Sequence, residues 1–157
     1  MEKFSYSYDS PFGRVYIAES EGAITDVASH PIAGSDEKET PLIKLAAEML
    51  VEYFDGRRVD FDLPLRPEGT EFQKKAWNAL LLIPYGQTRS YKEQAAAVGN
   101  VKACRAVGAA NGKNPISIII PCHRVIGSDK SLVGYGGGLE MKKALLELEK
   151  LLYRYES

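Results

Sequence analysis

Cys122 and His123 are adjacent in the Pro-Cys-His-Arg-Val segment of residues 121–125, which directly follows the apolar run of residues 116–120. Cysteine is the most nucleophilic of the common side chains, and the thiolate is its reactive form. The apolar run predicts a buried strand, and Pro121, which cannot continue a strand, predicts an abrupt exit from the core. These residues therefore favour a nucleophilic site, although most free cysteines are simply small buried side chains.

The composition is that of an ordinary globular protein, with 157 residues of which 45% are hydrophobic and 26% are charged. This length allows one domain of normal size or two small ones that share a core. No apolar run is long enough to span a bilayer, and the first residues show no secretory signal, so we expect a cytoplasmic protein without a membrane partner. The two cysteines, Cys104 and Cys122, indicate no disulfide framework and are expected to be reduced.

The net charge of −1 hides a difference between the two halves of the chain. Residues 1–70 carry 14 acidic and 7 basic side chains, whereas residues 71–157 carry 7 acidic and 13 basic ones. A basic half suggests an anionic partner, of which nucleic acid is the usual one. A solvated basic face opposite an acidic one would give the same counts, so charge alone leaves both interpretations open.

The amino-terminal part, residues 1–69, has the pattern of a small α/β layer. Strands are predicted at 4–8, 14–19 and 23–27, with turns between them that make an antiparallel meander. A polar loop follows at 30–39, and Thr40 with Pro41 predicts the start of a helix over 42–54. Prolines and glycines in 57–69 indicate the link to the second domain, residues 70–157.

The second domain has the pattern of a mainly helical unit. Thr70 and Gln73 predict a capping box for a helix that extends to residue 83, and Ser90 with Glu93 predicts another for a helix to residue 98. A Gly-Asn turn follows, and Asn100 is expected to cap a helix over 101–110. Two helices and a turn over about 91–110 have the outline of a DNA-binding helix-turn-helix.

The second of these helices is thin, because half of its residues are alanine or glycine. A thin helix can approach DNA closely, and Lys102 and Arg105 would project from it. Small residues also allow close packing between helices, so this feature by itself does not decide between a DNA-contacting helix and an ordinary packed helix.

Four motifs together resemble the O6-alkylguanine-DNA alkyltransferase family. They are residues 121–125, Arg-Ala-Val-Gly at 105–108, Asn-Pro at 114–115 and Tyr-Gly-Gly-Gly-Leu at 135–139. The match in residue types and spacing runs from about Thr70 to Glu149, and the amino-terminal half matches in its order of three strands and a helix. The resemblance implies a ribonuclease-H-like α/β layer followed by the helix-turn-helix domain.

The resemblance also implies an activity, the single-turnover transfer of an alkyl group from O6-alkylguanine in double-stranded DNA to a cysteine. Cys122 aligns with the alkyl acceptor, and His123 aligns with the histidine that takes the thiol proton through a water. Glu149 aligns with the carboxylate that orients this histidine, and Asn114 aligns with the asparagine that ties the second helix to the active-site segment. O4-alkylthymine is a further candidate substrate that the sequence does not decide.

On the DNA side, Tyr91 aligns with a tyrosine that rotates the target phosphate and bonds the guanine, and Arg105 aligns with the arginine that fills the space of the extruded base. We add Lys102, Ala106 and Arg124 to the expected DNA contacts. An alkyl group on a stacked base is out of reach of a cysteine rooted in a core, so the nucleotide must be flipped out, at a cost of a few kcal/mol.

The expected base pocket is formed by Tyr135, the carbonyl of Val125 and the backbone amide of Gly136. Glycines at 136–138 would let the backbone approach a ligand closely. Gly136 stands where some members have serine, Cys104 where alanine is frequent and Val101 where a proline is common. These departures bear on lesion size and helix stability, and they remove no catalytic group.

No cofactor and no metal are expected. No cysteine precedes Cys104, so a zinc cluster of the usual kind is absent, and His30 is expected to be a solvated loop residue. We expect a monomer that is cytoplasmic and, in a prokaryote, associated with the nucleoid. The alternatives are a non-catalytic protein that binds alkylated DNA, a regulatory helix-turn-helix protein with a structural Cys122, and a cysteine hydrolase.

Overall fold

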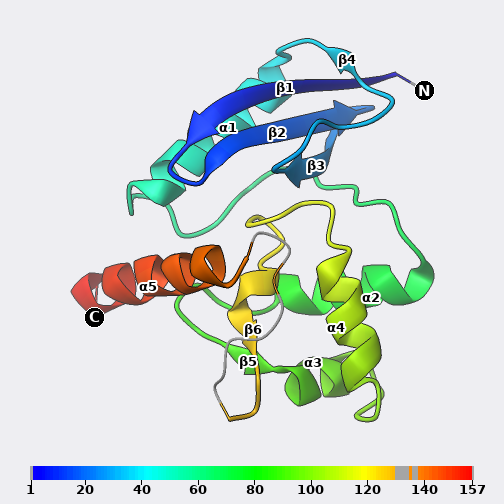
Figure 1. Cartoon of the computed structure of the whole chain (residues 1–157), viewed down its shortest axis with the longest axis vertical. Helices are drawn as coiled ribbons and strands as arrows, with labels where there is room; N and C mark the ends of the chain where they lie inside the picture. The colour runs from blue at the N-terminus through cyan, green and yellow to red at the C-terminus, as the bar shows by residue number, and fades with distance from the viewer. Residues whose placement is uncertain (1, 130–134, 136–137, 157) are drawn as a thin grey trace. The chain divides into compact units, whose positions relative to one another are not determined.

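The computed structural model describes residues 2–129, 135 and 138–156 (Figure 1). Its contacts divide the chain into two compact units, which are described separately. Unit 1 contains the chain up to Glu68 together with Pro115–Ile119, and unit 2 contains Gly69–Asn114 and the described residues from Ile120 onward. Residues 115–119 therefore pack with the first unit, although the sequence analysis places them in the second domain.

Unit 1 is a four-stranded sheet with one helix on it (Figure 1). The strands β1 (Lys3–Ser10), β2 (Gly13–Ser20) and β3 (Ala23–Ala28) form the predicted antiparallel meander. The two-residue strand β4 (Asp36–Glu37) lies within the predicted polar loop and pairs in parallel with β1, giving the order β3-β2-β1-β4. The α/β layer expected from the sequence is thus confirmed, with one short strand added.

Helix α1 (Pro41–Phe54) begins where the sequence predicts. The hydroxyl of Thr40 accepts a hydrogen bond from the amide of Ile43 at 3.2 Å, and Pro41 fills the first helical position, where no amide partner is needed. The same hydroxyl donates to Glu19 of β2 at 2.6 Å, which joins the start of the helix to the sheet. The apolar face of α1 is buried and includes Ile43, Ala46, Leu50 and Tyr53.

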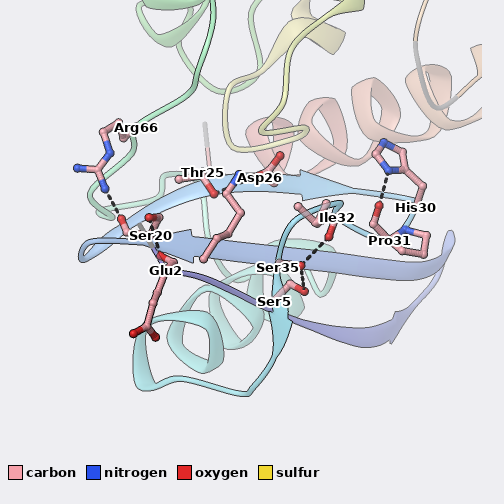
Figure 2. A network of polar contacts seen from close by, with 11 residues as sticks. Glu2, Ser5, Ser20, Thr25, Asp26, His30, Pro31, Ile32, Ser35 and Arg66 are labelled. Atoms are coloured by element: carbon pink, nitrogen blue, oxygen red, sulfur yellow. Dashed lines mark hydrogen bonds and ion pairs between the residues drawn. The ribbon is translucent and has the colours of Figure 1, made fainter.

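A network of polar contacts ties the edges of this sheet together (Figure 2). Lys3 of β1 reaches across to Asp26 of β3 with 3.1 Å between the ammonium and the carboxylate, and the hydroxyl of Thr25 donates to the same carboxylate at 2.7 Å. Ser5 and Ser35 bond through their hydroxyls at 2.7 Å, which attaches the loop before β4 to β1. His30 is exposed in that loop, as expected, with its Nδ1 3.0 Å from the carbonyl of Pro31.

The segment before Cys122 is buried, but the prediction of a strand there is wrong. Ile116 forms one parallel bridge with Val27 of β3, supported by a 2.9 Å bond from the amide of Val27 to the carbonyl of Pro115. Beyond that bridge, Ile118 has a φ of 72°. A β-branched residue rarely adopts this left-handed conformation, which breaks a ladder after a single pair.

Unit 2 is mainly helical, as predicted. Its elements are α2 (Glu71–Leu81), β5 (Arg89–Ser90), α3 (Tyr91–Ala97), α4 (Cys104–Gly112), a 3-10 helix (Cys122–Arg124), β6 (Val125–Ile126) and α5 (Leu139–Glu156). Both predicted capping boxes are present, at Thr70 with Gln73 and at Ser90 with Glu93. The short strands β5 and β6 pair in parallel.

Helix α4 begins three residues later than the sequence predicts, and Asn100 does not cap it. The side chain of Asn100 instead accepts a bond from the amide of Lys102 at 3.0 Å, and its carbonyl accepts one from Ala103 at 3.0 Å. A local turn thus competes with the cap for the same side chain. Helix α2 likewise ends at Leu81, two residues earlier than predicted.

Helices α2, α3 and α4 pack around a core of small side chains (Figure 1). Its buried members are Ala76, Ala95, Ala103, Val107 and Ala110. Trp77 is buried beside them, and its indole nitrogen donates to the carbonyl of Ala110 at 2.8 Å. None of the described helices is long and apolar enough to cross a membrane.

Gly69 provides a test of this packing. A methyl group added there would lie 2.5 Å from the Trp77 ring, too close without movement of the indole. We expect Gly69→Ala to lower the free energy of unfolding by about 1–3 kcal/mol, the usual cost of overpacking. Gly112→Ala is the matched control, since its added methyl meets nothing within 4 Å and helical alanine is preferred to glycine. Equal urea midpoints for the two variants would contradict the proposed clash.

Candidate active site

Cys122 opens the 3-10 helix and is 8% exposed. Its amide donates to the carbonyl of Ile120 at 2.8 Å, which bends the chain sharply at Pro121. The side-chain amide of Asn114 donates to the same carbonyl at 2.8 Å and to the sulfur of Cys122 at 3.3 Å. The thiol is therefore held by a donor that favours its ionised form.

His123 and Glu149 form the buried pair that the resemblance predicts. The Nε2 atom of His123 lies 2.5 Å from a carboxylate oxygen of Glu149, and the two residues are 0% and 1% exposed. The pair brings together a residue of the 3-10 helix and one of α5 that are 26 positions apart. Such a carboxylate fixes both the orientation and the tautomer of the imidazole.

Two further donors hold the carboxylate of Glu149. The guanidinium of Arg124 donates to it at 2.8 Å, and the amide of Gly86 donates at 3.3 Å. Burial opposes ionisation, but the hydrogen bonds and charges of His123 and Arg124 outweigh it and lower the pKa of Glu149 to about 2. Glu149 is thus an ionised carboxylate in the core at neutral pH.

The imidazole of His123 is neutral and has one nitrogen left for chemistry. Burial lowers the pKa of His123, against the opposing effect of its bond to Glu149. With the Nε2 proton directed at Glu149, Nδ1 carries the lone pair, and this atom is buried without a partner among the described residues. A buried lone pair of this kind can accept a proton, either directly or through a water.

Burial shifts the pKa of the Cys122 thiol in the opposite direction from that of His123. Burial raises its pKa, while the bond from Asn114 and the charge of Lys142 act to lower it. The thiol is therefore protonated at rest, and a base is needed to generate the nucleophile. The arrangement supplies that base and also two groups that stabilise the resulting thiolate.

Lys142 is the site residue that the sequence analysis missed. It is fully buried on α5, and its ammonium lies 5.9 Å from the centre of the Tyr91 ring. Burial lowers its pKa, and the charge of Cys122 acts in the opposite direction. A signal was available, because Lys142 precedes Glu149 by two helical turns and shares its face with the buried Leu145.

The structure describes two of the three predicted pocket residues, Val125 and Tyr135, together with Tyr91, which is predicted to bond the guanine. Val125 is buried in β6, and Tyr91 begins α3 with a pKa raised by burial and by the charge of Cys122. The hydroxyl of Tyr135 is buried without a partner in the described part of the chain, and burial and the charges of Cys122 and Glu149 raise its pKa. Gly136 lies outside the described residues.

Of the predicted DNA contacts, three are exposed in the structure and one, Arg124, is buried. Arg105 and Ala106 are exposed in the first turn of α4, and the exposed Lys102 lies two residues before this helix. Arg124 is 8% exposed, and besides Glu149 its guanidinium donates to the carbonyl of Ile83 at 2.8 Å. The guanidinium of Arg124 is thus buried on two protein acceptors, whereas an exposed side chain is expected for a DNA contact. No group of metal-ligating side chains occurs among the described residues.

Two family models match the chain over most of its length. The model of the 6-O-methylguanine DNA methyltransferase ribonuclease-like domain covers residues 4–67, and that of the DNA binding domain of the same family covers residues 71–151. The ribonuclease-like layer and the helical DNA-binding domain expected from the sequence are confirmed.

Curated relatives and solved structures agree with the family models. The methylated-DNA–protein-cysteine methyltransferase of Methanosarcina barkeri is 47% identical over 150 residues, which cover 90% of this chain and 94% of that protein. The constitutive enzyme of Bacillus subtilis is 45% identical, with 93% and 94% covered. The crystal structure of Mycobacterium tuberculosis OGT in complex with DNA superposes with a TM-score of 0.86 at 45% identity, covering 95% and 94% of the two chains.

The buried carboxylate predicts a definite pH dependence. Because the folded-state pKa of Glu149 lies near 2, below the ordinary 4.5, its contribution to stability is complete above pH 4.5 and is lost as pH falls toward 2. Glu149→Gln should lose about 3–5 kcal/mol at pH 7, the usual cost of breaking a buried pair. The free energy of unfolding of this variant should then change less between pH 4.5 and 2 than that of the wild-type protein.

Urea unfolding over a pH series measures both effects. Glu147→Gln is the matched control, since this carboxylate on the same helix is largely exposed and pairs weakly with Lys143 at 4.0 Å. A Glu149→Gln curve parallel to wild type would show that the carboxyl is not the group that titrates.

Proposed function

The chain belongs to the 6-O-methylguanine DNA methyltransferase family, and we propose that Cys122 is its alkyl-accepting residue. The activity is DNA repair by transfer of an alkyl group to a protein cysteine. The observation that supports Cys122 is its placement, with a donor from Asn114 on its sulfur and the His123–Glu149 pair directly after it in the chain. The proposed substrate is O6-alkylguanine in double-stranded DNA.

The reaction begins with the thiol proton. Nδ1 of His123 accepts this proton through a water, and the ionised Glu149 stabilises the imidazolium that forms. The Cys122 thiolate then attacks the alkyl carbon, so that an S–C bond forms while the C–O6 bond breaks and its electron pair remains on guanine. One proton passes to the guanine, which balances the proton removed from the thiol.

Groups around the sulfur stabilise the charges that develop. The ammonium of Lys142 offsets the negative charge of the thiolate in a site with little water. We assign the hydroxyl of Tyr91 as a donor to the guanine ring, and the Val125 carbonyl with the Gly136 amide as the groups that recognise the base. Tyr135, whose hydroxyl is buried, completes the proposed pocket.

Access to the lesion requires the nucleotide to leave the duplex. The cost of a few kcal/mol is smaller for a damaged pair, and a side chain that fills the gap offsets part of it. We assign this role to Arg105, which is exposed on a helix of small residues, with Lys102 and Ala106 beside it on the DNA. The protein is proposed to act as a monomer, in the cytoplasm, where its thiol stays reduced.

The proposed repair reaction is stoichiometric. A thioether is a poor leaving group, and the relay supplies only a base, so each molecule should accept one alkyl group. Intact-mass measurement with O6-methylguanine duplex should show one methyl replacing one hydrogen, located in the peptide that contains Cys122. Cys122→Ser should abolish the transfer, and the matched Cys104→Ser should retain it. Repeated turnover, or an adduct mainly on Cys104, would refute the assignment.

Base flipping and alkyl transfer can be measured separately. Arg105→Ala should slow repair of duplex DNA by about tenfold or more, because a loss of about 1.4 kcal/mol in the stability of the flipped state lowers the rate tenfold. It should leave transfer from free O6-benzylguanine nearly unchanged, since the free base needs no flipping. Lys113→Ala, which removes an exposed cation at the other end of α4, is the control. Equal slowing on the two substrates would exclude the proposed role of Arg105.

A further inference from the structure

We propose that the paired side-chain amides of Gln94 and Asn111 position helix α4 for the DNA duplex and take no part in the chemistry at Cys122. This inference rests on the proposed function, because it assumes that α4 carries the DNA-contacting residues. Neither residue belongs to the relay or to the expected DNA contacts.

The pair is reciprocal and well formed. Nε2 of Gln94 donates to Oδ1 of Asn111 at 2.8 Å, and Nδ2 of Asn111 donates back to Oε1 of Gln94 at 2.8 Å. Gln94 is 2% exposed and also donates to the carbonyl of Ala76 at 3.2 Å. One buried side chain of α3 therefore bonds to both α2 and α4.

The surrounding core explains why such a pair matters. The fully buried side chains of this cluster are four alanines and Val107, which interlock less than leucine or phenylalanine would, while Tyr91, Val98 and Cys104 pack against it only partly buried. Smooth contacts of this kind define the axial position and rotation of a helix only weakly, whereas an amide pair is satisfied in one register. A buried polar pair is best attested in this role, as a determinant of register.

The pair acts at one end of α4, and a second bond acts beside it. The indole of Trp77 donates to the carbonyl of Ala110, the residue before Asn111. Arg105 lies nearly two turns earlier, so a small rotation at Asn111 moves the whole exposed face that carries it. The duplex-reading face is therefore sensitive to this contact.

The thiol has side-chain anchors of its own, and its link to Asn111 runs through the backbone, since the amide of Asn114 donates to the carbonyl of Asn111 at 3.2 Å. Asn114 is held on the carbonyl of Ile120 through its own side chain, and His123 is held by Glu149 on α5. Loss of the amide pair should leave these bonds in place. Duplex repair and reaction with a free base should consequently separate in variants of Gln94 and Asn111.

The test measures alkyl transfer to Cys122 from an O6-methylguanine duplex and from free O6-benzylguanine. Gln94→Leu and Asn111→Leu should each slow the duplex reaction by about tenfold, because small misplacements have effects of this size. Both should leave the free-base reaction nearly unchanged. The double variant should be no slower than the slower single variant, since the two side chains form one unit. If Gln94→Leu does not fold, Asn111→Ala takes its place, because Asn111 is the half-exposed member of the pair.

Gln73→Leu is the stability control, because it removes the capping box of α2 and touches neither α4 nor the relay. It should lower the melting temperature without changing the ratio of the two rates. Equal slowing on both substrates, additive losses in the double variant, or an unchanged duplex rate would overturn the positioning role. A wild-type protein that takes an alkyl group from neither substrate would instead refute the proposed function.

Discussion

Removing a carboxylate from water costs several kcal/mol unless protein donors replace the lost hydration. Glu149 meets that requirement with three donors from two parts of unit 2, namely His123 and Arg124 of the 3-10 helix and the amide of Gly86. The tautomer of His123, the burial of Arg124 and the lone pair on Nδ1 all follow from this one ionised group. Without it, the guanidinium of Arg124 would be buried without a negative partner, bonded to the carbonyl of Ile83, and the imidazole of His123 would lose its orientation.

The backbone before the nucleophile is subject to a second constraint. The chain leaves unit 2 after Asn114, contributes residues 115–119 to unit 1, and returns to unit 2 at Ile120. Ile118 adopts a left-handed conformation within this excursion, which costs a β-branched residue roughly 1–3 kcal/mol. The side chain of Asn114 bonds to the carbonyl of Ile120, where the chain returns to unit 2. The same side-chain amide also donates to the sulfur of Cys122.

Chemistry and duplex recognition are thus assigned to different contacts of the same unit. The relay depends on charges buried between the 3-10 helix and α5, and its test is a pH profile. Recognition depends on the placement of α4 against α2 and α3, and its test is a ratio between two substrates.

The sequence by itself determined the local features and the chemistry. The cap at Thr40, both capping boxes, the meander and the adjacent Cys122 and His123 depend on neighbours within a few positions. The resemblance added Glu149, because its spacing from the glycine run follows a known pattern. These features survive without knowledge of the fold because their partners are close in the chain or match a motif.

Only the tertiary structure decided which side chains meet across long separations. In the sequence, Arg124 is a cation that could contact DNA. In the fold, it forms a buried ion pair with Glu149, which is 25 positions away. Lys142 has a helical spacing from Glu149 but no sequence sign of its proximity to Cys122. The actual start of α4 and the single bridge at Ile116 were also missed. At α4 the turn at Asn100 competed with the cap, and at Arg124 the carboxylate of Glu149 on α5 provided the partner. Contacts such as the one between Arg124 and Glu149 are decided only when distant segments pack together.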